Sequence, residues 1–142
     1  MQYELGNISV EAYQDLIRLA FQVCDRFIFH KHSQLRYDMC VDEFISELSD
    51  SFLFSRTQNK WPGTISVPSA EVFYFRTTEE AKQIILGACS SIYEWRAPCL
   101  PDDLTFLCKD EPWLVCTAHE HHCYIETDEE EVIKWLRLLQ NW

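Results

Sequence analysis

Hydrophobic residues recur at steps of three and four positions near the start of the chain. Ser9 stands where a helix N-cap would, and Glu11 lies just inside. The apolar positions that follow are Tyr13, Leu16, Ile17, Ala20, Phe21, Cys24, Phe27 and Ile28. This spacing places them on one face of an α-helix. We therefore predict a first helix of about five turns, followed by a polar connection over residues 30–37.

Three later segments show the same helical period. The first covers residues 37–53, and its apolar positions are Cys40, Val41, Phe44, Ile45, Leu48 and Phe52. The second begins at Thr77 or Thr78, either of which suits an N-cap, and its apolar stripe ends at Trp95. The third follows Thr127 and Asp128, with Glu130 at the capping-box position.

Four shorter segments are predicted to be strands, at residues 71–76, 104–108, 113–118 and 123–126. They carry the aromatic and β-branched residues that suit a pleated sheet, and short turns join the last three. Residues 55–69 contain prolines and a glycine and predict a long surface loop. The fold class is therefore α+β, in a single domain with about four helices. Its antiparallel sheet is expected to be small, made of the C-terminal three-strand meander and one earlier strand.

Composition narrows the classes of function. The chain has 142 residues, with 12 Lys and Arg against 23 Asp and Glu, so its formal net charge is −11. Because a chain this acidic repels the phosphate backbone of nucleic acids, we expect no nucleic-acid partner. No apolar stretch approaches the ~20 residues of a membrane span, and we expect no membrane association. The 7 cysteines, with no CxxC pair, suit a reducing compartment, so we expect a cytoplasmic protein.

Residues 119–123 concentrate metal-binding side chains in the sequence His-Glu-His-His-Cys. On an extended chain alternate residues point the same way, so His119, His121 and Cys123 would form one set of zinc ligands. A zinc-protease helix needs a second histidine four residues after the first, and Cys123 stands there instead. The same segment also suits a solvated hairpin tip. We expect no cofactor, with zinc as the alternative.

Two further groupings are candidates for catalysis. Cys116 with His119 and Glu120 would form a thiol centre, although an acidic environment does not activate a thiol. Asp102 and Asp103 suit either an acid–base pair or a surface turn, and their place after a proline favours the turn. We expect the cysteines to be buried and structural. We also expect His119 and Glu120 to close the strand end through hydrogen bonds with the backbone.

Tryptophan is abundant for a chain of this length. Trp61, Trp95 and Trp113 are candidates for a recognition patch, because Trp is enriched at the hot spots of interfaces. Trp61 is expected to anchor the long loop to the core. Alternatively, Tyr74, Trp95 and Trp113 would line a small-molecule pocket between the sheet and the helices.

Three stretches carry a resemblance to a known group of proteins. They are WPGT at 61–64, LPDDLTF at 100–106, and PWLV at 112–115 followed by AHE at 118–120. Together they resemble a family of small, uncharacterised bacterial cytoplasmic proteins with no established activity. The resemblance covers most of the chain and implies a bacterial, cytoplasmic protein. It draws attention to His119 and Glu120, because Ala-His-Glu recurs in that family at a strand end, whereas residues 121–123 depart from its pattern.

The residues are compatible with functions of different classes. The first is a non-enzymatic, acidic binding protein of the immunity or inhibitor type, whose partner is another protein with a basic surface. Its binding residues would be Trp61, Trp95, Trp113, His119 and Glu120. The alternatives are a metal-dependent or thiol enzyme, or a small-molecule binder, centred on Cys116, His119 and Glu120. A deep pocket holding His119 and Glu120 would favour the alternatives, and a flat acidic face would favour the partner.

Overall fold

The structure, a computed structural model, describes residues 1–140 and has an α+β fold. Its helices are α1 (Val10–Val23), α2 (Met39–Glu47), α3 (Glu79–Ala88) and α4 (Glu130–Gln140), with 3-10 turns η1 (Ser49–Ser51), η2 (Ile92–Glu94) and η3 (Ala118–Glu120). Its strands are β1 (Gln2–Leu5), β2 (Arg26–His32), β3 (Phe52–Trp61), β4 (Thr64–Arg76), β5 (Asp102–Cys108), β6 (Glu111–Thr117) and β7 (His122–Glu126). The predicted class and the four helices are confirmed. Within the described residues, no helix is long and apolar enough to cross a membrane.

All the strands belong to one antiparallel sheet, with the order β1-β7-β6-β5-β2-β4-β3. The predicted C-terminal meander is present as β5, β6 and β7. The sheet has 7 strands, so the prediction of a small sheet was wrong in size. The strands that the sequence did not reveal are β1, β2 and β3, together with the first half of β4.

The first predicted helix is correct at its start and too long at its end. The Ser9 hydroxyl accepts a hydrogen bond from the Ala12 amide at 3.1 Å, as an N-cap does. The helix stops at Val23, and residues 26–32 form β2 between β4 and β5. Phe27 fits the helical period and the strand period equally well, so its spacing could not mark the boundary. Backbone pairing on both sides of β2 decides in favour of the strand.

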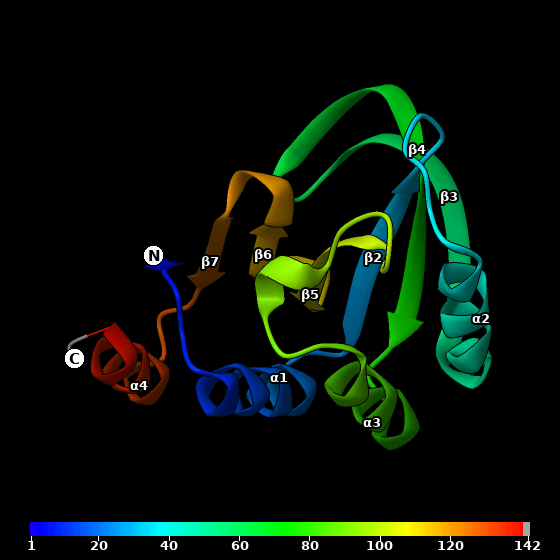
Figure 1. Cartoon of the computed structure of the whole chain (residues 1–142). Helices are drawn as coiled ribbons and strands as arrows, with labels where there is room; N and C mark the ends of the chain where they lie inside the picture. The colour runs from blue at the N-terminus through cyan, green and yellow to red at the C-terminus, as the bar shows by residue number, and fades with distance from the viewer. Residues whose placement is uncertain (141–142) are drawn as a thin grey trace.

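The predicted loop at residues 55–69 is instead a long hairpin made of β3 and β4. Gly63 lies at its tip with φ +84°, and a Cβ atom there would stand 2.6 Å from Cγ1 of Val115 on β6. Only glycine suits both that backbone and that approach. The hairpin therefore curls back over the sheet, and Figure 1 shows it arching from the side of α2 toward the end of β6.

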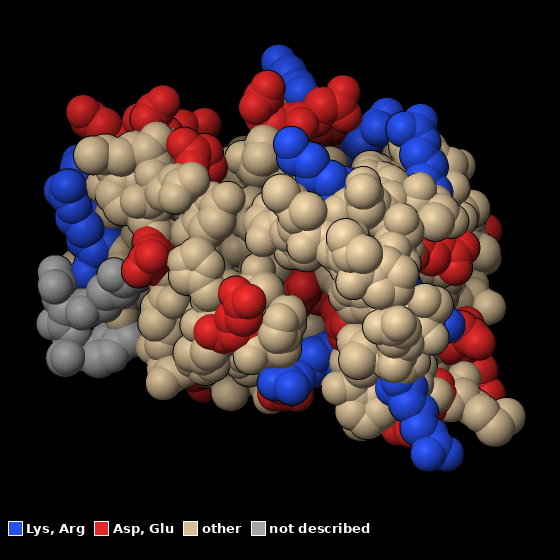
Figure 2. Space-filling view, turned by 90° about the horizontal axis from the view of Figure 1, so that it is seen from above, with Lys and Arg blue, Asp and Glu red and all other residues tan. Residues whose placement is uncertain are grey.

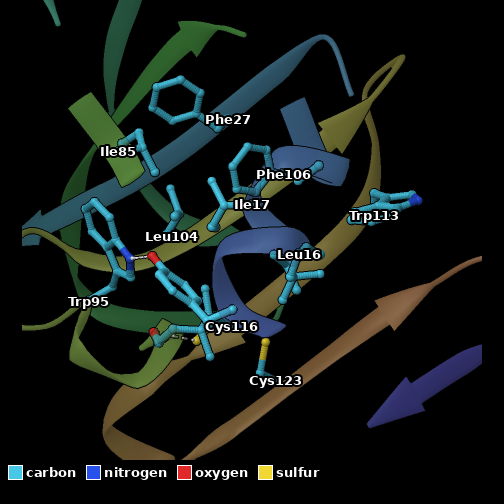
Figure 3. Packing of buried hydrophobic residues seen from close by; sticks show 14 of the residues in the cluster. Leu16, Ile17, Phe27, Ile85, Trp95, Leu104, Phe106, Trp113, Cys116 and Cys123 are labelled. Carbon is cyan, nitrogen blue, oxygen red and sulfur yellow. Dashed lines mark hydrogen bonds between the residues drawn. The ribbon is translucent and has the colours of Figure 1, made fainter. Parts of the chain in front are cut away.

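The two faces of the sheet bury different cores. The helices cover one face, and Figure 3 shows the packing of α1, α3 and the strands there. In this helix-side core the Trp95 indole donates a hydrogen bond to the Tyr13 hydroxyl at 3.0 Å. The hairpin covers the other face, over a hairpin-side core of Ile28, Trp61, Ala70, Val72 and Leu107.

Candidate functional site

A cluster of polar side chains lies at the end of the hairpin-side core, where β2 ends and β5 begins. His30 and His32 stand two residues apart on β2 and therefore share a face of the sheet. Their Nε2 atoms are 3.0 Å apart. The His30 ring lies against Trp61, with the ring centroids 4.5 Å apart, so the tip of the hairpin covers it.

Asp102 and Asp103 both reach this cluster because β5 carries an extra residue. Ile28 pairs with Thr105 and His30 pairs with Asp102, so two steps along β2 match three along β5. Asp103 takes the left-handed conformation with φ +62°. Such a bulge changes the direction of side chains that would otherwise alternate between faces. Asp102 Oδ2 is 3.9 Å and Asp103 Oδ2 is 3.6 Å from His30 Nε2.

The surface turn predicted for these two aspartates was wrong, because Asp102 is 5% and Asp103 3% exposed. Neighbouring groups hold Asp102 in place. The Tyr37 hydroxyl donates to Asp102 Oδ2 at 3.1 Å, and it accepts a hydrogen bond from the His32 amide at 3.0 Å. The Ala97 amide donates to Asp102 Oδ1. Tyr37 thus links Asp102 to β2, and the carboxylate is oriented before any ligand binds.

Asp103 is fixed from three directions. Its Oδ1 accepts from the Ala118 amide at 2.8 Å, its amide donates to the Trp95 carbonyl at 2.9 Å, and its carbonyl accepts from the Thr105 hydroxyl at 3.0 Å. Burial raises the pKa of Asp103 to about 7, and Asp102 adds to that effect. The pair of carboxylates is therefore held close together away from water.

His30 supplies a neutral imidazole to this cluster. Burial, followed by the charges of His32 and His119, lowers the pKa of His30 to about 3. The ring is thus uncharged at pH 7, and its contacts with the two carboxylates are not ion pairs. A neutral imidazole is the form that binds metal ions.

A pocket of about 390 Å³ opens beside the cluster. His32, Asp102 and His119 line it together with Arg96, and Leu35, Val67 and Pro68 are among its apolar residues. It lies at the upper end of the molecule in Figure 1, where β2 and β6 end, and Figure 2 views the molecule from that end. Of the polar cluster, His32 and Asp102 face this space.

Three of these residues could hold a metal ion. One ligand atom from each of His30, His32 and Asp102 lies within 4.8 Å of the other two. Around a tetrahedral zinc ion with bonds of about 2.0–2.1 Å, ligand atoms are about 3.3 Å apart. The measured separations of 3.0 Å and 3.9 Å from His30 Nε2 bracket that value. The separation between the ligand atoms of His32 and Asp102 is likewise within 4.8 Å.

The zinc ligands predicted from the sequence, His119, His121 and Cys123, do not converge. His119 lines the pocket, His121 contacts Asn7 Oδ1 at 2.8 Å on the surface, and Cys123 is buried in the helix-side core. The prediction assumed an extended chain. The structure has the turn η3 there, and His121 is left-handed with φ +53°, so alternate residues no longer point the same way.

The predicted thiol centre is not assembled either. A hydrogen bond with Cys123, together with burial, raises the pKa of Cys116 far above its ordinary value, so no thiolate forms. Glu120 is exposed, and its Oε1 lies 3.9 Å from His119 Nε2. The strand end is closed by Asp103 and by the backbone bond from His121 N to Ala118 O, where we had expected His119 and Glu120.

The three tryptophans predicted to form a recognition patch are buried. Trp95 and Trp113 belong to the helix-side core, and Trp61 belongs to the hairpin-side core. None of them presents an exposed ring to a partner. Tyr74 packs against the hairpin-side core. The sheet therefore separates Tyr74 from Trp95 and Trp113, and the predicted small-molecule pocket between them does not form.

His30, His32 and Tyr37 are the site residues that the sequence did not reveal. A signal was present: Phe27 and Phe29 alternate with Ile28, His30 and His32, which is the pattern of a strand with an apolar face and a second, mixed face. The WPGT, LPDDLTF and AHE stretches singled out in the sequence also meet here. WPGT forms the hairpin tip over His30, LPDDLTF supplies both aspartates, and AHE contributes His119 and the amide that binds Asp103.

Comparison with known proteins gives no match to this chain, whether to family models, to curated proteins or to solved structures. A functional assignment therefore depends on the geometry and chemistry of the site described above.

Proposed function

We propose that this protein binds one divalent first-row transition-metal ion, such as zinc, through His30, His32 and Asp102, and presents it to the adjoining pocket. The observation that carries this proposal is the convergence of the three ligand atoms within 4.8 Å. Two imidazoles and one carboxylate are a common ligand set for catalytic zinc and for non-haem iron.

The charges around the site favour a cation. Asp102 and Asp103 are buried together, and among the described residues no Lys or Arg lies within ion-pair distance of either carboxylate. Burial also raises the pKa of Asp102. Buried carboxylates without a counter-charge are costly, and a bound divalent ion would supply the missing positive charge.

The position of the ligands favours a reactive or ligand-binding metal over a structural one. Structural zinc sites have four protein ligands, whereas catalytic sites have three and leave one position open. Here three ligands converge, and two of them, His32 and Asp102, line the pocket. An ion held by them would face the pocket and could bind and polarise a small molecule there.

Metal titration of untagged protein tests the proposal. Chelator-treated protein should bind about one zinc or cobalt ion per chain, measured by elemental analysis after dialysis and by competition with a chromophoric chelator. His32→Ala and Asp102→Asn should each lower the affinity by about a hundredfold or more, since even the loss of an outer-shell partner costs 10–100-fold. His121→Ala is the matched control, because that exposed histidine lies outside the cluster.

Two results would overturn the proposal. One is the absence of stoichiometric metal in the wild-type protein. The other is metal binding that is weakened by His121→Ala and not by His32→Ala. His32 is only half-buried, so its alanine variant should fold, and an unchanged circular dichroism spectrum would verify this.

The role of an acidic interaction protein stays a prediction, and the net charge of −11 is what supports it. In Figure 2 several acidic residues lie along the upper edge of the face, next to Lys and Arg residues, and others are scattered over the rest of it. A partner with a basic surface would associate through that edge at a rate that falls steeply with salt. His32→Ala would leave such an association unchanged, which separates the two proposals.

A further inference from the structure

The pocket beside the proposed metal site is lined by both charged and apolar side chains. We infer that its ligand is a small organic acid, whose carboxylate lies between Arg96 and the metal ion and whose short apolar body contacts Leu35, Val67 and Pro68. The inference rests on the proposed function, because the metal ion is one of the two cationic groups that would bind the carboxylate.

Arg96 is the cationic residue of the pocket. It is the only Lys or Arg in the described lining, and none of the ion pairs among the described residues includes it. It lines the same pocket as Asp102 and His32. The backbone around it is fixed, since its amide donates to Glu94 O and its carbonyl accepts from Leu100 N. A guanidinium that is in no ion pair with the described residues and extends from a held backbone suits a carboxylate, which it can bind through two parallel hydrogen bonds.

The other polar groups of the pocket can all donate hydrogen bonds. If His32 and Asp102 bind the metal, the remaining polar lining is Gln34, Ser66, His119 and Arg96. All of these can donate, although Gln34, Ser66 and His119 can also accept, and among the described lining residues no other carboxylate is present. Such a set favours a ligand rich in acceptor oxygens over a cationic ligand.

Apolar residues also line the pocket, and two of them are unusually exposed. Leu35 is 47% and Val67 91% exposed, although both line a pocket that also holds charged groups. Exposed apolar side chains at the mouth of a pocket commonly contact a ligand. The volume of about 390 Å³ lies near the lower end of the range for ligand pockets, about 300–1,000 Å³. It suits a short-chain acid better than a nucleotide.

Calorimetric titration of the zinc-loaded protein tests the inference with three probes. These are 3-methylbutanoate, its neutral amide 3-methylbutanamide, and inorganic phosphate. The acid should bind at least about tenfold more tightly than either the amide or phosphate, because only the acid offers both the charge and the apolar body. The zinc content of each sample is measured first.

Arg96→Gln should weaken binding of 3-methylbutanoate by about tenfold or more while the zinc content stays unchanged. Arg56→Gln is the matched control, because Arg56 lies on β3 over the Phe54 ring and outside the pocket. Val67→Ser should reduce the preference for 3-methylbutanoate over acetate. Equal binding of the acid and its amide, tighter binding of phosphate, or an Arg96→Gln variant that binds like the wild type would each overturn the inference.

The same titration on metal-free protein separates this inference from the proposed function. If the protein binds no zinc but still binds the acid in an Arg96-dependent way, the proposed metal site is wrong and the ligand class stands. If zinc binds and neither form of the protein binds the acid, the ligand class is wrong and the metal site stands.

Discussion

His30 and His32 are two residues apart on β2, and His119 and His121 are two residues apart after β6. The two segments have the same His-x-His spacing and opposite outcomes. The first brings its Nε2 atoms to 3.0 Å from each other. In the second, His119 turns to the pocket and His121 contacts Asn7 on the surface.

The difference lies in the backbone between the histidines. β2 is paired on both sides, with β4 and with β5, so its pleat is fixed and alternate side chains share a face. Residues 118–120 form the turn η3 and His121 is left-handed, which rotates each side chain to a new direction. Two histidines at this spacing therefore form a shared site only where strand pairing fixes the alternation of side chains along the backbone.

The two segments also differ in what covers them. Trp61 and the hairpin tip lie over His30, whereas His119 and His121 are exposed. The hairpin excludes water from His30, and this burial keeps its imidazole neutral by lowering its pKa to about 3. A buried, neutral His30 with His32 and two carboxylates beside it is suited to binding a cation, and an exposed pair is not.

Gly63→Ala should have the largest effect, because it disturbs the cover over the first pair. The left-handed φ and the 2.6 Å approach to Val115 should together cost about 2–4 kcal/mol of unfolding free energy. Urea denaturation measures this. Gly87→Ala in α3 is the control: nothing lies within 4 Å of its added Cβ, and it should stabilise the protein by about 0.5–1 kcal/mol. A Gly63→Ala variant as stable as the wild type would show that the hairpin does not pack on β6.

Asp103→Ala should be less stable than Asp103→Asn by about 1–3 kcal/mol. Both variants remove the charge, but Asn tolerates the left-handed backbone and still offers an oxygen to the buried Ala118 amide. The difference between their urea midpoints measures how much residue 103 stabilises the bulge that brings the second carboxylate to His30. Equal midpoints would mean that this hydrogen bond does not hold the bulge.

Cys123→Ala tests whether the second segment includes a metal ligand. The thiol is buried in the helix-side core, so its loss should cost about 1 kcal/mol of stability and leave zinc affinity unchanged. Cys40→Ala, at an exposed position, should change stability by less than about 0.5 kcal/mol. Loss of zinc binding in Cys123→Ala would instead support His119, His121 and Cys123 as the zinc ligands.

His121→Ala should have the smallest effect, within about 0.5 kcal/mol of the wild type in thermal or urea unfolding. The variant loses an exposed contact with Asn7 and the stacking on Tyr93, and nothing buried is left without a partner. A loss of more than about 2 kcal/mol, of the size seen for buried sites, would contradict the contrast between the two histidine pairs.

Local signals predicted the parts of the fold that depend on neighbouring residues. The Ser9 cap, the start of α1, the Thr78 cap of α3 and the meander β5–β7 were all readable, because caps, turns and periods act over a few residues. The end of α1 at Val23 and the strands of the long hairpin could not be predicted from the sequence. There the local pattern fits more than one structure, and pairing with distant strands decides between them.

The sequence by itself determined the α+β class, the acidic charge, the helix caps and the presence of histidine-rich segments. Only the tertiary structure decided which histidines meet the aspartates. Tyr37 and Asp102 are 65 positions apart, and they meet because β2 pairs with β5. A bulge in β5 turns Asp103 to the same side of the sheet as Asp102. Strand register and a single left-handed residue set these directions, and neither has a signature in residue spacing.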